Sequence, residues 1–358
     1  MSTLPAAFRG SEIRDVCEKA LAGERLFFDD GVRLFRTNDM AALGWAANRL
    51  RERRHGNVAW YLKNRHINYS NVCKYDCFFC SFFRSSPADD GAWEWNVDQV
   101  LEHVAPYKDS GLKEFHIVGG VHPTLPFSYY TDMLRALRRE HPGVAIKAFT
   151  AIEIAYFAEL TGMTLEQVLT ELKDAGLRYK ICREKADDDR WFEVHEAAHR
   201  LGIPTNATML FGHIETLEER VDHLMRLRDM QDRTGGLLCY IPLRFHPDNN
   251  VLGRKKLGEP SGLDTLRNVA IGRLLLDNVE HIKAYWIMLG IKPAQLALSW
   301  GADDFDGTVT WERIYHMAGA KTPESLDETR IREVIEEAGR TPVERDAFYN
   351  RVAEEVPA

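Results

Sequence analysis

The sequence predicts an α/β fold, a complete or partial (β/α) barrel of the TIM-barrel type. Between residues 57 and 320, short apolar runs rich in Val, Ile, Phe and Tyr alternate with stretches of helical spacing. This alternation is typical of parallel βαβ units, and six or more units are enough for a barrel. A doubly wound open sheet is the alternative. The composition, 45% hydrophobic and 28% charged over 358 residues, is that of an ordinary globular protein.

The expected strands are β-branched or aromatic runs that end in turn residues. They cover 58–69, 114–118, 144–150, 205–211, 238–245 and 281–288. The gaps between them carry apolar residues at helical spacing, and the expected helices cover 97–110, 127–139, 165–175, 191–201, 216–232 and 263–279.

Two further segments flank this core of residues 57–320. Helices expected at 11–22 and 39–54 make residues 1–56 an N-terminal helical segment. A helix expected over 327–339 makes residues 321–358 a helical C-terminal extension. Each of these helices follows a plausible capping residue or stops at one.

Charge and hydropathy exclude some classes of function. Lys and Arg number 46 and Asp and Glu number 54, a net charge of −8, which argues against a broad nucleic-acid surface. No run approaches the length of a membrane span, and the N-terminus lacks the features of a signal peptide. We therefore expect a cytoplasmic protein with neither nucleic acid nor membrane as a partner.

Three of the six cysteines lie close together, as Cys73-x3-Cys77-x2-Cys80 in the loop after the first expected strand. Three thiolates can hold three corners of a cubane [4Fe-4S] cluster and leave the fourth iron open to a ligand. A structural zinc ion would need a fourth ligand, such as His66. A disulfide would leave one cysteine over. The remaining cysteines are scattered and expected to be structural: Cys17, Cys182 and Cys239.

This cysteine spacing after a first strand resembles the radical S-adenosylmethionine (SAM) superfamily. The resemblance implies that the three cysteines hold a [4Fe-4S] cluster, that SAM binds the open iron, and that one electron cleaves SAM to a 5′-deoxyadenosyl radical. It implies a reducing partner such as flavodoxin or ferredoxin. It places Phe79 near the adenine, and it assigns Gly119 and Gly120 to binding the methionine amino group through backbone carbonyls, where a Cβ would leave no room.

Segments 116–123, 241–247 and 301–308 are similar, more narrowly, to the aminofutalosine synthase family. This resemblance implies that SAM is a co-substrate. Its deoxyadenosyl group is joined to 3-[(1-carboxyvinyl)oxy]benzoate, an aromatic enol-ether dicarboxylate. Radical aryl migration and decarboxylation then give 6-amino-6-deoxyfutalosine, in menaquinone biosynthesis. The enzyme alternatives are dehypoxanthine futalosine cyclase and a deazaflavin synthase subunit. The non-enzyme alternative is an iron–sulfur or zinc protein with a structural or electron-transfer role.

Polar residues at the expected strand ends are candidates for contacts with SAM. Glu153 follows the third strand and is either a ribose ligand or a carboxylate that stabilises a helix start. Asn206 and Thr208 alternate along one strand and therefore point the same way. They either face the chamber, with Asn206 as a cofactor contact, or fill the barrel.

A second group of candidates concerns the substrate. His122 follows the Gly-Gly turn and either assists proton transfer or contacts the substrate, or is a hydrogen-bonded loop histidine with a structural role. Arg244 and His246 share a strand face and are candidates to pair with the two substrate carboxylates, since Arg binds carboxylates through two parallel hydrogen bonds. His213 and Glu215 either contact the substrate or cap the next helix.

Two features stand apart from this assignment. Members of the family carry a Pro-Gly-Gly-Gly-Ala-Glu segment near the fourth strand, whereas here Leu177 runs directly into Arg178. The chain therefore departs from the family at the fourth strand and the adjoining pocket. Asp303, Asp304 and Asp306 resemble a calcium loop only superficially, because the other ligands of such a loop are missing.

Overall fold

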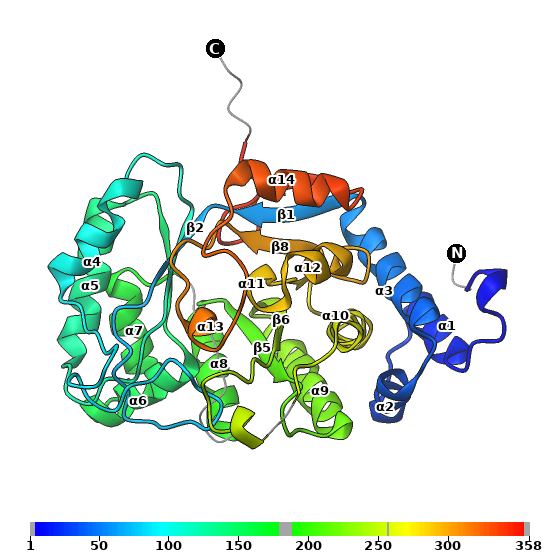
Figure 1. The fold of residues 1–358 in the computed structure, drawn as a ribbon, viewed down its shortest axis with the longest axis horizontal. Coiled ribbons are helices and arrows are strands. Elements are labelled where there is room, and N and C mark those ends of the chain that lie inside the picture. Colours follow the sequence, from blue (N-terminus) through cyan, green and yellow to red (C-terminus); the bar gives the residue numbers. More distant parts are fainter. Residues whose placement is uncertain (1–3, 179–187, 256–257, 354–358) are drawn as a thin grey trace, which may run out of the picture.

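The computed structural model describes residues 4–178, 188–255 and 258–353 (Figure 1). Its strands form three three-stranded sheets with the orders β8-β1-β9, β2-β3-β4 and β5-β6-β7, and every pairing within them is parallel. The strands are β1 (Val58–Leu62), β2 (Asn64–Ile67), β3 (Glu114–Ile117), β4 (Ala145–Ala148), β5 (Thr205–Phe211), β6 (Leu237–Arg244), β7 (His281–Ile282), β8 (Asp304–Gly307) and β9 (Thr341–Glu344).

Helices cover the outside of these strands. Helices α4 to α7 lie together on one side, and α14 lies over β1 and β8 (Figure 1). The α-helices are α1 (Arg14–Ala22), α2 (Phe28–Arg36), α3 (Met40–His55), α4 (Val97–Val104), α5 (Phe127–Glu140), α6 (Ala151–Thr161), α7 (Leu165–Ala175), α8 (Asp188–Arg200), α9 (Leu217–Thr234), α10 (Gly262–Leu275), α11 (Trp286–Leu289), α12 (Ile291–Ala297), α13 (Ile314–Met317) and α14 (Glu328–Glu337). The short 3-10 helices are η1 (Ala6–Phe8), η2 (Ala105–Tyr107) and η3 (Gly253–Lys255).

Isolated parallel bridges connect the three sheets at their edges. A parallel bridge between Lys283 and Asp304 joins β7 to β8, and one between Arg65 and Thr310 joins β2 to the residues after β8. Beyond β4, the amide of Arg178 donates to Ile146 O at 3.0 Å. The parallel α/β fold is thus confirmed. Closure into a complete barrel is not found among the described residues, and Cys182 lies outside them.

Several expected elements needed correction. The strand expected at 58–69 is divided at Lys63 into β1 and β2. The strand expected at 281–288 is wrong in its second half: β7 has two residues, and helix α11 follows. Every residue from 281 to 289 is buried, and periodicity cannot separate strand from helix where all faces are apolar.

The C-terminal extension contains a strand as well as the expected helix. Strand β9 pairs with β1, with Val58 opposite Thr341.

Helix α2, near the N-terminus, was not expected either; it packs against α9 and α10. Asp304 and Asp306 lie in strand β8, and Asp303 directly precedes it, in keeping with the merely superficial resemblance to a calcium loop.

Buried ion pairs fix β8. Asp303 accepts from Arg273 Nη2 at 2.5 Å and from His281 Nδ1 at 2.6 Å. Asp304 accepts from Arg345 Nη2 at 2.6 Å, and Asp306 pairs with Lys283. These carboxylates are therefore committed to tying β8 to its neighbours.

Arg345→Met should destabilise the iron-free chain strongly, by about 3–5 kcal/mol, because it leaves the buried Asp304 carboxylate without its main cation. The matched control is Arg33→Met. It breaks an exposed pair with Asp15 and should cost less than about 1 kcal/mol. Urea unfolding checks both. Equal, small losses would show that the buried pair does not hold β8.

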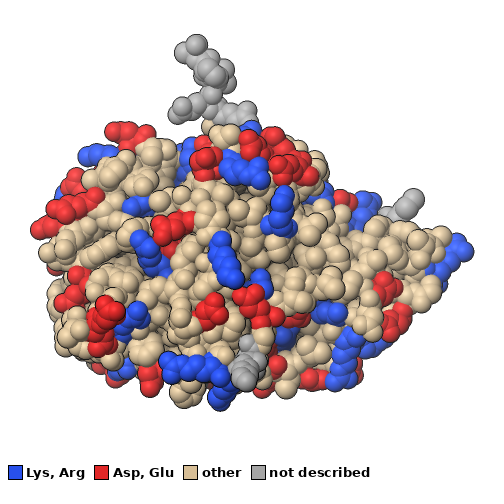
Figure 2. Space-filling view, viewed as in Figure 1, with Lys and Arg blue, Asp and Glu red and all other residues tan. Residues whose placement is uncertain are grey.

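Charges of both signs alternate over the face shown in Figure 2, and no broad region of one sign covers that face. No helix among the described residues has both the length and the apolar character that crossing a membrane would require.

Candidate active site at the cysteine loop

The three cysteines lie on a long loop that follows β2 and is held by the backbone of its neighbours. The amide of Cys73 donates to Arg84 O at 2.9 Å, and the amide of Lys74 donates to Val121 O at 2.8 Å. The amide of Cys80 donates to Cys77 O at 2.9 Å, so these two cysteines sit on one turn. Cys73 is buried, whereas Cys77 and Cys80 are half-buried.

The sulfurs of the three cysteines are not all within 4.8 Å of one another. A single ion needs its ligand atoms close together, and the one group of three or more His, Cys, Asp or Glu ligand atoms within 4.8 Å among the described residues is His55, His281 and Asp303. The cysteine sulfurs do not form such a group, whereas three thiolates on one loop can hold three corners of a cubane cluster. His66, the fourth ligand considered for zinc, instead stacks on His116 with ring centroids 4.2 Å apart.

Gly119 and Gly120 lie directly against the cysteine loop. A Cβ on Gly120 would stand 2.2 Å from Val72 O, and one on Gly119 would stand 2.4 Å from Cζ of Tyr69. The amide of the next residue, Val121, faces Cys73 Sγ at 3.3 Å. Glycine is thus required here by close backbone approach, and both glycines line a small cavity of about 40 Å³ together with Cys73 and Cys80.

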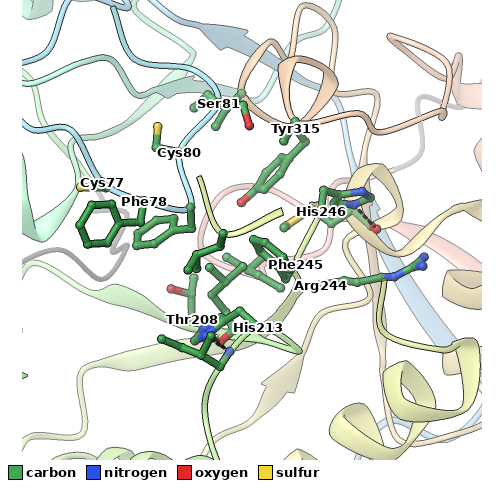
Figure 3. A pocket seen from close by; sticks show the side chains of 18 residues that line it. Cys77, Phe78, Cys80, Ser81, Thr208, His213, Arg244, Phe245, His246 and Tyr315 are labelled. Carbon is green, nitrogen blue, oxygen red and sulfur yellow. Dashed lines mark hydrogen bonds between the residues drawn. The ribbon is translucent and has the colours of Figure 1, made fainter. Parts of the chain in front are cut away.

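A larger cavity of about 490 Å³ opens beside this one (Figure 3). Cys77 and Cys80 lie on one side of it, and His246 and Arg244 lie on the opposite side (Figure 3). The remaining lining is mostly apolar and comes from the cysteine loop, β5 and β6 with the residues that follow them, and helices α11 and α13: Phe78, Phe79, Ser81, Thr208, Leu210, His213, Ile214, Leu243, Phe245, Leu252, Met288, Ile314, Tyr315 and Ala318. Such a chamber suits an aromatic molecule and chemistry that water would disturb.

His246 lines this cavity and, within the described ranges, has an unused hydrogen-bond acceptor. Its Nε2 donates to Met288 O at 2.9 Å, so Nδ1 is left unprotonated. Nδ1 is buried and has no hydrogen-bond partner among the described residues. Burial lowers the pKa of His246 and favours this neutral form.

Arg244 lines the same cavity, but its guanidinium points away from it (Figure 3). Nη2 donates to Glu259 Oε2 at 2.7 Å. The Nε atom is buried and without a hydrogen-bond partner in the part of the chain that is described. Arg244 would therefore have to exchange Glu259 for a substrate carboxylate.

His122 lies outside both cavities. Its Nδ1 accepts from the amides of Thr124 and Leu125, each at 3.2 Å, so Nε2 carries the proton and donates to Glu94 Oε2 at 2.7 Å. Both ring nitrogens are thus used to hold the loop after the Gly-Gly segment. The geometry fits a structural histidine better than a proton-transfer group.

Glu153 and Asn206 were predicted to contact the cofactor. Glu153 is the third residue of α6 and forms a capping box with Thr150, which favours the helix-start interpretation. Asn206 is buried on β5 and lines neither cavity, although its Oδ1 has no hydrogen-bond partner among the described residues. Thr208, two residues further along the same face, does reach the large cavity.

His213 and Glu215 were considered for substrate contact or for capping the next helix, and their surroundings differ. His213 lines the large cavity. Burial alone would raise the pKa of Glu215, but hydrogen bonds from His213 and from the Gly212 amide, together with Arg220, lower it to about 2. Glu215 is therefore a fixed anion that holds the loop before α9, and it does not line the cavity.

Sequence reasoning missed a polar pocket of about 40 Å³ beside the large cavity. The two share Thr208 and Tyr315 among their lining residues. The polar lining of the small pocket includes His66, His116, Lys147, Lys283, Asp306 and Glu312. A signal was present: Lys147 interrupts the otherwise apolar β4, and β3 carries both Glu114 and His116. A buried Lys in a strand needs partners inside the fold.

Helix α13, which closes one side of the large cavity, was also missed. It depends on His316, whose Nδ1 and Nε2 donate to Glu312 O at 2.6 Å and to Thr322 O at 3.0 Å. Two donating nitrogens require the imidazolium form. The hydrogen bond to the Glu312 side chain raises the pKa of His316 to about 9, against the effect of burial.

This pKa gives stability a defined pH dependence. The stabilisation is complete below pH 6.5, the ordinary His value, and is lost as pH rises through about 9, where the folded-state imidazolium deprotonates. His316→Gln should therefore lower the Tm of the iron-free chain by a few degrees at pH 6 and have little effect at pH 10. A difference in Tm that is independent of pH would contradict the assignment.

Comparison with known proteins gives the family of the chain. Residues 67–227 match the radical SAM superfamily, and residues 234–356 match the CofH/MqnC C-terminal region. The chain is 46% identical to the aminodeoxyfutalosine synthase of Thermus thermophilus, over 96% of this chain and 97% of that protein. It is 38% identical to the aminodeoxyfutalosine synthase of Streptomyces coelicolor, over 95% of this chain and 94% of that protein.

Among solved structures, methylornithine synthase shares the fold, with a TM-score of 0.72 at 17% identity, covering 91% of this chain and 97% of that one. Radical SAM enzymes as a family use a [4Fe-4S] cluster and SAM, and the three cysteines lie within the matched residues 67–227. The chain is therefore a member of the radical SAM enzyme superfamily and, within it, of the aminodeoxyfutalosine synthase family.

Proposed function

We propose that this protein joins the 5′-deoxyadenosyl group of SAM to 3-[(1-carboxyvinyl)oxy]benzoate, with aryl migration and decarboxylation, to give 6-amino-6-deoxyfutalosine. The observation that carries the proposal is the similarity to aminodeoxyfutalosine synthases over nearly the whole length of both chains. The cavity beside the cysteine loop supports it, because it is largely apolar, lies at the carboxyl ends of parallel strands and has room for an aromatic molecule.

When bound, the [4Fe-4S] cluster supplies the electron that cleaves the C5′–S bond of SAM. Cys73, Cys77 and Cys80 would hold it. Gly119 and Gly120 would accept the methionine part of SAM in the small cavity. Phe79, in the lining of the large cavity, would contact the adenine. Cys80 and Ile314 line both cavities, so the two parts of SAM would sit close to each other and to the substrate.

The large cavity would hold the substrate. Its apolar side chains would pack on the benzoate ring and exclude water from the reacting atoms. His246 would line the substrate site without pairing with a carboxylate, because Nε2 is used by Met288 O and the neutral Nδ1 can only accept a hydrogen bond. The Arg244 guanidinium would bind a carboxylate after leaving Glu259. The electron would come from a donor such as flavodoxin or ferredoxin. Its point of approach would be the edge of the loop at Phe78, which is 64% exposed.

Parallel anaerobic reactions test the proposal against its closest alternatives. The reconstituted, reduced protein receives SAM with the enolpyruvyl benzoate, with dehypoxanthine futalosine, or with tyrosine and ribitylaminouracil. We expect a substrate-dependent product only in the first reaction. Turnover confined to the second or third would identify the cyclase or the deazaflavin synthase activity. Absence of SAM cleavage from protein with a full cluster would favour a structural or electron-transfer role.

A further inference from the structure

A buried tyrosine and a buried glutamate meet behind the Gly119-Gly120 segment. Tyr69 follows β2, and Glu153 lies in the first turn of α6. The Tyr69 hydroxyl donates to Glu153 Oε1 at 2.7 Å, and the two side chains are almost completely buried. A buried carboxylate is costly unless several donors satisfy it, so its partners indicate what it holds in place.

Four donors converge on Glu153, and all of them belong to the protein. The amide and the hydroxyl of Thr150 donate to Oε2, each at 2.7 Å. Oε1 accepts from the Tyr69 hydroxyl and, at 3.4 Å, from the amide of Gly119. Both oxygens are thus engaged inside the fold. Glu153 lines neither cavity, which argues against a direct contact with the ribose of SAM.

Tyr69 extends this network to the other side of the glycine segment. A Cβ on Gly119 would lie 2.4 to 2.7 Å from three carbons of the Tyr69 ring, so the ring packs directly on this residue. The Tyr69 hydroxyl also lies 3.3 Å from Gly120 O. From the cysteine loop, Ser70 O accepts from the Gly120 amide at 2.7 Å. The glycine backbone is therefore held from two sides.

We propose that Tyr69 and Glu153 are a positioning pair: they fix the Gly119-Gly120 backbone against the cysteine loop, in the orientation that receives the methionine part of SAM. The inference rests on the proposed function only as far as SAM binding, not on the identity of the second substrate. It replaces a ribose-binding role for Glu153 with an indirect one, exerted through Tyr69 and the amide of Gly119.

Conservative variants distinguish the positioning role of Tyr69 and Glu153 from a direct contact between Glu153 and the ribose of SAM. Tyr69→Phe keeps the ring that packs on Gly119 and removes only the donor. Glu153→Gln keeps the shape and replaces one acceptor oxygen with an amino group that faces donors. Tyr129→Phe is the matched control: it removes another tyrosine hydroxyl of the same aromatic cluster, one that donates to Trp95 O rather than to Glu153.

The first measurement is the Kd of SAM for the reconstituted protein, by equilibrium dialysis. We expect Tyr69→Phe and Glu153→Gln each to weaken binding about tenfold, the scale of one lost hydrogen bond to a charged group. The double variant should also be weakened about tenfold rather than a hundredfold, because the two residues act as one unit. Tyr129→Phe should bind SAM like the parent. Additive losses in the double variant would overturn the pairing.

Two further readouts keep the inference testable. In the iron-free chain, hydrogen exchange of the Gly119 and Gly120 amides should be faster in Tyr69→Phe and Glu153→Gln than in the parent and in Tyr129→Phe. With a 2′-deoxyribose analogue of SAM, Glu153→Gln should discriminate against the analogue as strongly as the parent does. Loss of that discrimination would make Glu153 a ribose ligand and overturn the proposal.

If Glu153→Gln does not fold, Tyr69→Phe alone decides, by its Kd for SAM and by the exchange rates of the glycine amides. A protein that binds SAM as expected but rejects the benzoate would contradict the proposed function and leave this inference standing.

Discussion

Cys73→Ala, Cys77→Ala and Cys80→Ala should each reduce SAM cleavage to background while leaving the fold intact. Each variant removes one of the three ligands that the loop offers, and no other cysteine among the described residues lies on this loop to replace it. Iron and sulfide content after anaerobic reconstitution, together with cleavage of SAM, measures the effect. Retained turnover in any one of the three would refute the ligand assignment.

The control variants are Cys17→Ala and Cys239→Ala. Both thiols are buried, and burial raises the pKa of each to about 12. They are therefore neutral thiols packed in the core rather than the thiolates that bind iron. Both variants should keep full iron content and SAM cleavage. Loss of iron in either would mean that the wrong set of cysteines has been chosen.

Gly120→Ala should have the next largest effect. The added methyl group would lie 2.2 Å from Val72 O, a backbone atom that cannot move without shifting the cysteine loop. We expect SAM binding to be weakened by about 5- to 100-fold, in line with the roughly 1–3 kcal/mol cost of overpacking.

The matched control for Gly120→Ala is Gly143→Ala, because a Cβ there meets nothing within 4 Å. It should bind SAM and retain iron like the parent. The measurements are the Kd of SAM and the iron content of both variants. Unchanged SAM binding in Gly120→Ala would show that the close approach to Val72 is not needed for the site.

The sequence predicted the parallel α/β core well, because most of its strands and helices have strong periodicity and clear ends. The expected strand 205–211 and the expected helix 165–175 coincide with β5 and α7. The failures occur where periodicity carries little information. Strand β8 begins with acidic residues that suggest a loop, and only the partners brought by tertiary structure, such as Arg345, explain their burial.

Some parts of the candidate site could be predicted from the sequence, and others could not. The cysteine spacing and the Gly-Gly segment are local patterns, and the structure places them in contact. The roles of polar residues depend on long-range partners that the sequence does not reveal. His122 is committed to Glu94, and Glu153 is committed to Tyr69. Likewise, Tyr315 and Met288 reach the large cavity from short helices that have no distinctive sequence pattern.

The most direct test of the proposed function follows the adenosyl carbon itself. SAM labelled with carbon-13 at C5′ is incubated anaerobically with the reduced, reconstituted protein and the enolpyruvyl benzoate, and mass spectrometry locates the label. The proposed synthase predicts that the label enters 6-amino-6-deoxyfutalosine, with little free 5′-deoxyadenosine. Label found only in free 5′-deoxyadenosine would contradict adenosyl transfer and with it the proposed function.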